Sequence, residues 1–334
     1  MKRRRLLLST LGLAGCGSPL LSTVYAASQN PLAGTPIEGI DLRHMTASAA
    51  APIVYYCPKV SAQSLINLFG VSGFQLKDKV GIKMTFENAS AKAVKLNPDL
   101  IRPFVQQVKG TLIDSNYFDS ARSNVRRHLE TAKENGYADV GPIDILDAEG
   151  EIRLPVKGGY HLKNLLTGSH LKDYGTLISI VRFKGHNLAR YGGTVKNLSI
   201  CLGTAGGASQ IHSGGKVEDH YSAASDKVVS ESMADAVKAA LDYKPGRWLF
   251  FNVLDAIEPQ RRDDCKDAKN LGDLGILMST DPIACDQAAV DIVYGFAPNE
   301  QIRNQWEKDH HTDSLSMAEK IGVGSTKYRL QVIR

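Results

Sequence analysis

The chain has 334 residues, of which 43% are hydrophobic and 22% charged, with five cysteines and a formal net charge of +5. This composition is that of an ordinary globular protein and excludes a disordered, collagen-like or coiled-coil chain. The length suits one large domain or two of moderate size. Five cysteines without a CxxC pair argue against a disulfide scaffold, a zinc ribbon or a ferredoxin motif.

The first 26 residues predict an export signal. Four basic residues, Lys2 to Arg5, precede a short apolar run, and the first acidic residue of the chain is Glu38. The apolar run at 6–14 is much shorter than the roughly 20 residues of a membrane span. Residues 1–26 carry four positive charges and no negative one, so the remainder has a net charge of only +1. We therefore expect a periplasmic or otherwise extracytoplasmic protein with no transmembrane span and no nucleic-acid partner.

Two processing routes are open. Cleavage after Ala26 would release a soluble protein, which is the route we favour, whereas the sequence before Cys16 is similar to a lipobox and would give a lipid anchor. The basic run resembles a twin-arginine signal, with a general secretion signal as the alternative.

Residues 27–51 are rich in Ala, Ser, Pro and Thr and predict a linker or a loosely packed lead-in to a body over 52–334. The body is expected to begin with a strand at 52–57, a helix at 61–69, a strand at 79–86 and a helix at 98–109. A strand at 111–113, a helix at 120–135 and a strand at 143–146 come next. Strands at 177–183, 248–254 and 274–278 and helices at 226–241 and 282–294 follow.

This alternation of strands and helices predicts an α/β fold with largely parallel sheets. We expect two lobes around a cleft, with the chain crossing between them near 150–170, where Gly, Pro and basic residues are dense.

The strongest candidate site is the glycine-rich stretch that follows the strand at 177–183. Among its glycines, this stretch contains three lysines and three histidines: Lys184, His186, Lys196, His212, Lys216 and His220. Imidazoles exchange protons or bind metals near neutral pH, and lysines bind anions or form covalent adducts. Open α/β sheets bind ligands at the carboxyl ends of their strands. The sequence therefore predicts a site for a small anionic ligand or substrate along 184–216.

Other polar groups are weaker candidates. Asp114 and Asn116 follow an early strand, where they could line the same crevice or simply form a turn. Lys83 and Glu87 flank the end of the preceding strand, where they could contact a substrate carboxylate or a cofactor, and the interpretation we favour is a solvated salt bridge.

The motifs of this chain resemble the bacterial family called domain of unknown function 362. The resemblance rests on 184–186, on 192–200 with its paired glycines, on 211–216, on 154–159 and on 274–284, and it extends from about residue 52 to the C-terminus. The biochemical activity of that family is not established, so the resemblance implies a fold more than a function. Many relatives carry iron–sulfur cysteine clusters.

A more distant resemblance concerns nickel-pincer lactate racemases. The spacings from His186 to Lys196 and from Lys196 to His212, with the paired glycines before the lysine, are similar to the active-site stretch of those enzymes. The resemblance implies that His186 is a general acid or base, that Lys196 tethers a pyridinium-derived cofactor and that His212 is a metal ligand.

The sequence thus assigns catalysis to Lys184 and His186. The residues expected to hold a cofactor are Gly192, Gly193, Lys196, Asn197 and Lys216, and His212 is expected to bind a metal.

The cysteine spacing does not favour an iron–sulfur cluster. Cys57, Cys201, Cys265 and Cys285 are widely separated in the sequence. We expect buried, inert thiols at Cys201 and Cys285, whereas Cys265 stands in a polar setting.

The functional hypothesis is a cofactor- or metal-dependent enzyme with redox or isomerase chemistry on a small organic acid. The alternative is a periplasmic binding protein, or a metal- or iron–sulfur-associated protein, that has no turnover.

Overall fold

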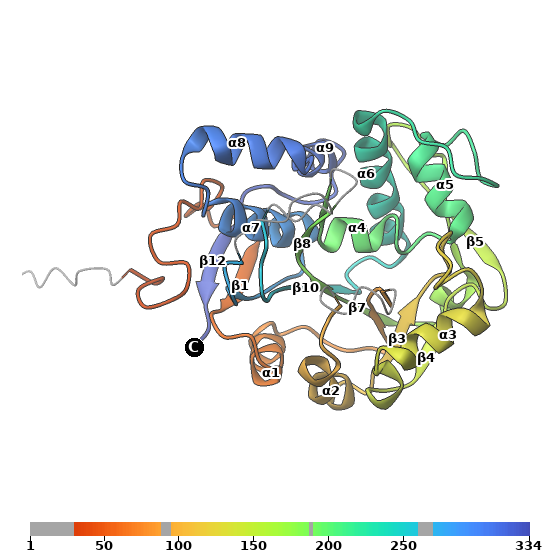
Figure 1. The fold of residues 1–334 in the computed structure, drawn as a ribbon, viewed down its shortest axis with the longest axis horizontal. Helices are drawn as coiled ribbons and strands as arrows, with labels where there is room; N and C mark the ends of the chain where they lie inside the picture. Colours follow the sequence, from red (N-terminus) through yellow and green to blue (C-terminus); the bar gives the residue numbers. More distant parts are fainter. Residues whose placement is uncertain (1–29, 88–94, 187–189, 260–269) are drawn as a thin grey trace, which may run out of the picture.

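A computed structural model describes residues 30–87, 95–186, 190–259 and 270–334, which are organised around one eight-stranded sheet (Figure 1). The strands, in spatial order, are β12 (Arg329–Val332), β1 (Ile53–Cys57), β11 (Gly275–Ser279), β10 (Trp248–Leu254), β7 (Thr176–Arg182), β2 (Val80–Lys83), β3 (Thr111–Asp114) and β4 (Ile143–Ile145). Strand β11 runs antiparallel to both of its neighbours, and every other neighbouring pair in this sheet is parallel. The expected α/β fold with a largely parallel sheet is confirmed.

Helices cover both faces of the sheet (Figure 1). Helices α1 (Ala62–Val71) and α2 (Pro98–Gln107) lie on one face, and α4 (Thr194–Leu198), α6 (Asp226–Tyr243) and α7 (Pro282–Tyr294) lie on the other. The remaining α-helices are α3 (Val125–Glu134), α5 (Ala205–Ser213), α8 (Glu300–Asp309) and α9 (Ser314–Lys320), with short 3-10 helices at Tyr137–Asp139 and Ser169–Asp173. Two hairpins stand apart from the sheet: β5 (Glu151–Pro155) with β6 (Asn164–Gly168), and β8 (Lys184–His186) with β9 (Arg190–Gly192).

The central strands are buried on both faces because alternate side chains enter two different apolar layers. In β10, Leu249 and Phe251 pack in the layer beneath α1 and α2, whereas Trp248 and Phe250 pack in the layer formed with α6 and α7. Such strands appear in the sequence as continuous apolar runs and not as alternating ones. Strand β10 occupies the positions expected for it, 248–254.

Helix starts follow local capping chemistry. The side chains of Asn97 and Asp281 accept hydrogen bonds from the first backbone N–H groups of α2 and α7, and each is followed by a proline. Both starts agree with the sequence prediction. Helix α3 is shorter than the expected 120–135, because Asn124 caps its N-terminus by accepting a hydrogen bond from the Arg127 N–H.

Residues 30–51, for which the sequence predicts a linker or a loosely packed lead-in, contact the body through buried side chains. The side chain of Ile37 is fully buried, Leu32 and Leu42 belong to the same apolar layer, and Met45 bridges to Tyr328. Composition alone does not reveal these contacts, because three buried apolar side chains are enough to hold a segment that is otherwise polar and irregular.

The expected crossing near 150–170 contains hairpin β5–β6. Strand β4 precedes it and β7 follows it, and both belong to the one large sheet. The division into two lobes stays a prediction.

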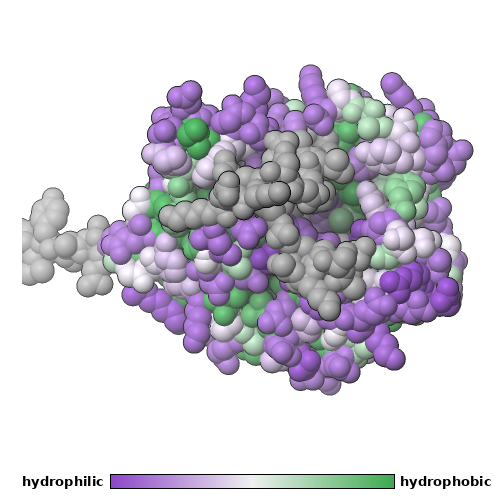
Figure 2. All heavy atoms as spheres, viewed as in Figure 1, coloured by the Kyte–Doolittle hydropathy of each residue, from purple (hydrophilic) through white to green (hydrophobic). Residues whose placement is uncertain are grey.

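None of the helices in the described ranges is long and apolar enough to cross a membrane. The face of the molecule in Figure 2 is covered largely by hydrophilic residues, with smaller apolar areas between them.

Candidate functional site

A cavity of about 290 Å³ lies at the carboxyl ends of three neighbouring parallel strands, β7, β2 and β3. Its lining comes from the segments that follow these strands, from hairpin β8–β9 and from helices α4 and α5. This is the place where open α/β sheets bind ligands, because loops from parallel strands converge at one edge. The lining residues are Met84, Thr85, Glu87, Leu96, Tyr117, Asp119, Arg122, Ile180, Val181, Arg182, Lys184, Gly192, Gly193, Lys196, Asn197, Ile200, Cys201 and His212.

Four cationic and two acidic side chains line this cavity. The ammonium of Lys184 lies 2.6 Å from a carboxylate oxygen of Glu87. The Arg122 Nε donates to Asp119 over 2.9 Å, and the Arg182 Nε lies 2.7 Å from Asp255. Burial alone would raise the pKa of Glu87, but Lys184, Arg122 and Lys196 outweigh it and hold that pKa below its ordinary value. The positive excess makes the cavity suitable for an anion.

Lys196 differs from the other cations of the cavity. Within the described part of the chain, no hydrogen bond or ion pair involves its ammonium. Burial lowers the pKa of Lys196 to about 8, opposed by Cys201 and Glu87 and assisted by the like charges of Lys184 and Arg122. An amine with this pKa exists in both protonation states near neutral pH, which suits proton transfer, anion binding or covalent attack.

Helix α4, which carries Lys196, is only five residues long and is anchored by a buried carboxylate. Asp286 accepts hydrogen bonds from the N–H groups of Thr194 and Val195 over 2.8 and 2.9 Å. A side chain at Gly193 would lie 2.8 Å from the same carboxylate oxygens, so a glycine is needed where α4 begins. These contacts fix the position of Lys196 relative to the sheet.

The other end of α4 is held from the sheet. Asn197 donates to the carbonyl of Lys83 and to the hydroxyl of Ser179, and its side-chain oxygen accepts from the Lys83 ammonium over 2.9 Å. Asn197 therefore orients α4, although one face of its side chain also borders the cavity.

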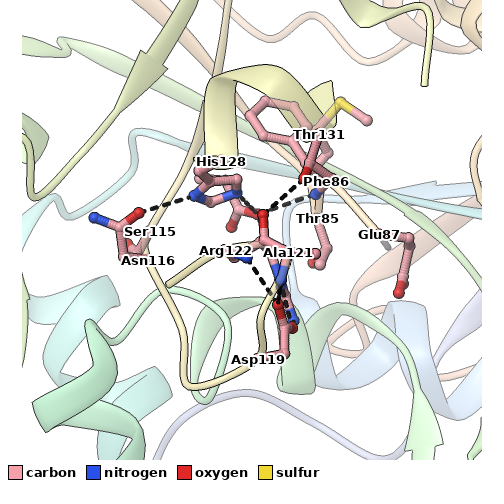
Figure 3. A network of polar contacts seen from close by, with 12 residues as sticks. Thr85, Phe86, Glu87, Ser115, Asn116, Asp119, Ala121, Arg122, His128 and Thr131 are labelled. Carbon is pink, nitrogen blue, oxygen red and sulfur yellow. Dashed lines mark hydrogen bonds and ion pairs between the residues drawn. The ribbon is translucent and has the colours of Figure 1, made fainter. Parts of the chain in front are cut away.

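A buried polar network lies next to the cavity and includes Arg122 of its lining (Figure 3). The fully buried ammonium of Lys83 donates over 2.9 Å to Asp114, while the other oxygen of that carboxylate lies 3.2 Å from the ring of His128 and 3.9 Å from Arg122. Burial would raise the pKa of Asp114, but Lys83, His128 and Arg122 hold it well below its usual range. The network thus links the sheet to Arg122, a residue of the cavity lining.

Residues 80–291 match the sequence family described as "Domain of unknown function (DUF362)". The chain belongs to the DUF362 family. The matched region contains all of the cavity lining. No curated protein matches the chain.

Two solved structures are similar to this DUF362 protein. One is the lactate racemase apoprotein from Thermoanaerobacterium thermosaccharolyticum, with 11% identity and a TM-score of 0.39 over 61% of this chain and 51% of that one. The other is a structural genomics protein from Thermotoga maritima, with 7% identity and a TM-score of 0.40 over 78% of this chain and 58% of that one. This chain therefore matches little more than half the length of each structure.

Most of the residues expected from the DUF362 motifs lie together. The cavity brings together the following six: Lys184, Gly192, Gly193, Lys196, Asn197 and His212. Lys216 is exposed after α5 and lies outside the lining. His186 ends strand β8, and its side chain lies outside the described part of the structure.

Several cavity residues were not predicted from the sequence. Tyr117, Asp119 and Arg122 come from the segment after β3, and the sequence gives no direct sign that they meet the 184–212 stretch; Glu87 is only one of the weaker candidates of the sequence. Lys83 and Glu87 do not form the expected solvated pair, because the buried Lys83 bonds with Asp114 and Glu87 pairs with Lys184 in the cavity lining. Lys83 is the last residue of β2, whereas Glu87 lies beyond the strand in the segment that lines the cavity, so the two residues have different partners.

The cysteines differ in their surroundings. Cys285 is buried in α7, as expected, whereas Cys201 is only partly buried and lines the cavity. Cys57, Cys201 and Cys285 are free thiols, and Cys265 lies outside the described residues.

The described residues do not by themselves form a metal site. Lys196 and the imidazole of His212 share the cavity, but in the parts of the chain that the structure describes no three His, Cys, Asp or Glu side chains gather into a metal-binding group. Among the described side chains, His212 therefore lacks the further ligands that would complete a metal site.

Proposed function

We propose that this DUF362 protein is an enzyme that acts on a small organic acid by isomerase or redox chemistry. The single observation that carries the proposal is Lys196, an amine with a pKa near 8 inside a cavity with excess positive charge. Perturbed amines in cavities are the groups that exchange protons or attack carbonyl carbons near neutral pH.

Different residues of the cavity would bind the carboxylate and transfer the proton. The carboxylate of the substrate would lie among Lys196, Arg122 and Lys184, because their charges converge on one cavity. Lys184 is engaged with Glu87 and so serves to bind and orient the anion and not as a base. Lys196 would hold or move the proton. His186, on the same hairpin as Lys184, is the proposed acid or base at the substrate carbon.

The same excess of cations also fits a binding protein without turnover, since an anion can be held without any reacting group. The two functions differ in what happens to the bonds of the bound acid. We also propose an extracytoplasmic location, supported by the sequence of residues 1–26.

The test is isotope exchange in deuterated water. Purified protein is incubated with a panel of small carboxylic, hydroxy and keto acids, and deuterium incorporation at carbon is followed by mass spectrometry, while affinity is measured by calorimetry. An enzyme that abstracts a proton from carbon incorporates deuterium into at least one acid, and Lys196→Ala abolishes the incorporation. For redox chemistry, the same mixtures are analysed for oxidised or reduced products.

A binding protein would show affinity that depends on Lys196 but neither exchange nor product. Absence of both binding and chemistry across the panel would refute the proposal.

A further inference from the structure

Four aromatic rings form a continuous chain beside the cavity. The distance between ring centroids is 5.3 Å for Tyr117 and Phe118, 6.2 Å for Phe118 and Tyr221, and 5.1 Å for Tyr221 and His212. The two end members, Tyr117 and His212, line the cavity. The two middle members are exposed, Phe118 by 39% and Tyr221 by 50%. The chain therefore connects the cavity lining with an aromatic surface at its border.

These two exposed rings come from unrelated parts of the fold. Phe118 follows β3, and Tyr221 lies between α5 and α6. Single exposed apolar residues are common and need no explanation. Two rings brought together from distant segments, both touching residues of a ligand cavity, form a site where a third ring can pack edge to face or in an offset stack.

The size of the cavity supports the same conclusion. The volume of about 290 Å³ is at the lower limit for small-molecule sites but exceeds the roughly 150 Å³ in which a benzene ring fits, so the cavity holds a carboxylate together with part of a larger substituent. The cations that would hold the carboxylate are Arg122, Lys184 and Lys196, and Arg122 itself lies 5.0 Å from the Tyr117 ring. Because Tyr117 lines the cavity and its ring contacts Phe118, a substituent that extends along Tyr117 would meet the exposed rings.

We propose that the organic acid carries an aromatic ring, which packs against Phe118 and Tyr221 while its carboxylate is held in the cavity. This inference rests on the proposed function, because it takes the cavity as the site of an acid. It makes Phe118 and Tyr221 specificity-determining residues, separate from the residues that act on the acid.

The experiment compares the affinities of matched acids that differ only by a phenyl group. Dissociation constants of the full chain are measured by calorimetry for propionate against 3-phenylpropionate and for acetate against phenylacetate. The phenyl acids are expected to bind roughly three- to tenfold more tightly through ring packing. In Tyr221→Ala this preference falls toward one, Tyr221→Phe keeps it, and Phe118→Ala reduces it. Tyr243→Ala is the matched control, because Tyr243 is an exposed ring at the end of α6 that is not part of the lining.

The outcomes separate the two ideas. If the plain acids bind in a Lys196-dependent way but the phenyl acids bind no better, the aromatic inference is overturned and the proposed function stands. The inference also fails if the phenyl preference survives Tyr221→Ala and Phe118→Ala. If no acid of either series binds, the proposed function itself fails. Circular dichroism confirms that the variants fold, as expected for exposed side chains.

Discussion

At the scale of single residues, the molecule contains two kinds of buried lysine. Lys83 is fully buried, and its three N–H donors are satisfied by Asp114, Asn197 and a backbone carbonyl. An ammonium whose donors are all used in this way is part of the framework. Lys196 is only partly buried from solvent and, among the described residues, has no such partners, so its pKa of about 8 is open to change by what enters the cavity.

The titration of Lys196 is directly measurable. Because its pKa is about 8, the neutral amine should form near pH 8, and at pH 7 its neutral fraction should exceed that of an ordinary lysine by roughly two orders of magnitude. Competitive acetylation across pH, read by mass spectrometry, gives the midpoint, with exposed Lys216 as the internal reference. Glu87→Gln should lower the midpoint, because it removes a negative charge that favours the ammonium. Lys184→Met should raise it. Equal midpoints in all three proteins would contradict this account.

At the scale of elements, the short helix α4 sets the position of Lys196 in the cavity. Helix α4 has five residues, too few for a stable helix on its own. It keeps its place because Asp286 binds its first N–H groups and Asn197 ties it to β2 and β7. The position of Lys196 therefore depends on contacts outside its own helix.

The matched pair Asp286→Asn and Asp235→Asn tests that dependence. Both aspartates are buried and accept backbone N–H groups, Asp286 from α4 and Asp235 from residues 160–162. Each change should lower the free energy of unfolding by about 1.5–3 kcal/mol, measured by urea denaturation. Only Asp286→Asn should also move the Lys196 midpoint upward, toward that of a solvated lysine. A shift of the same size in Asp235→Asn would show that α4 has no special anchor.

At the scale of the whole molecule, the stretch 30–51 belongs to the fold. It joins the apolar layer of α6 and α7 through Ile37 and Leu42, and the Arg334 guanidinium donates to carbonyls near its start. The two ends of the described chain thus meet at one side of the sheet.

Ile37→Ala measures how much this segment contributes. A fully buried isoleucine in a packed layer should lose about 2–5 kcal/mol of unfolding free energy when truncated. If 30–51 were a loose lead-in, the change would stay within about 0.5 kcal/mol, as for surface positions. Urea denaturation of the two proteins distinguishes these results, with exposed Met45→Ala as the control in the same segment.

Local signals explain which parts of this structure were predictable. Capping residues and prolines located the starts of α2 and α7, and glycines with lysines located the Lys184 to His212 part of the site. Glu87 and Arg122 could not be placed, because their meeting with Lys184 requires β2 and β3 to lie next to β7. Strand order is a property of the crossover connections, and hydrophobic periodicity contains no information about it.

The borders of the sheet have a consequence for self-association. The outermost strands are β12, with four residues, and β4, with three, and the side chain of Asp144 in β4 already binds Tyr174 and contacts His170. Such short edges give another chain little backbone to pair with. Copies of this protein would therefore have to meet through their helices and loops and not by extending the sheet from one molecule to the next.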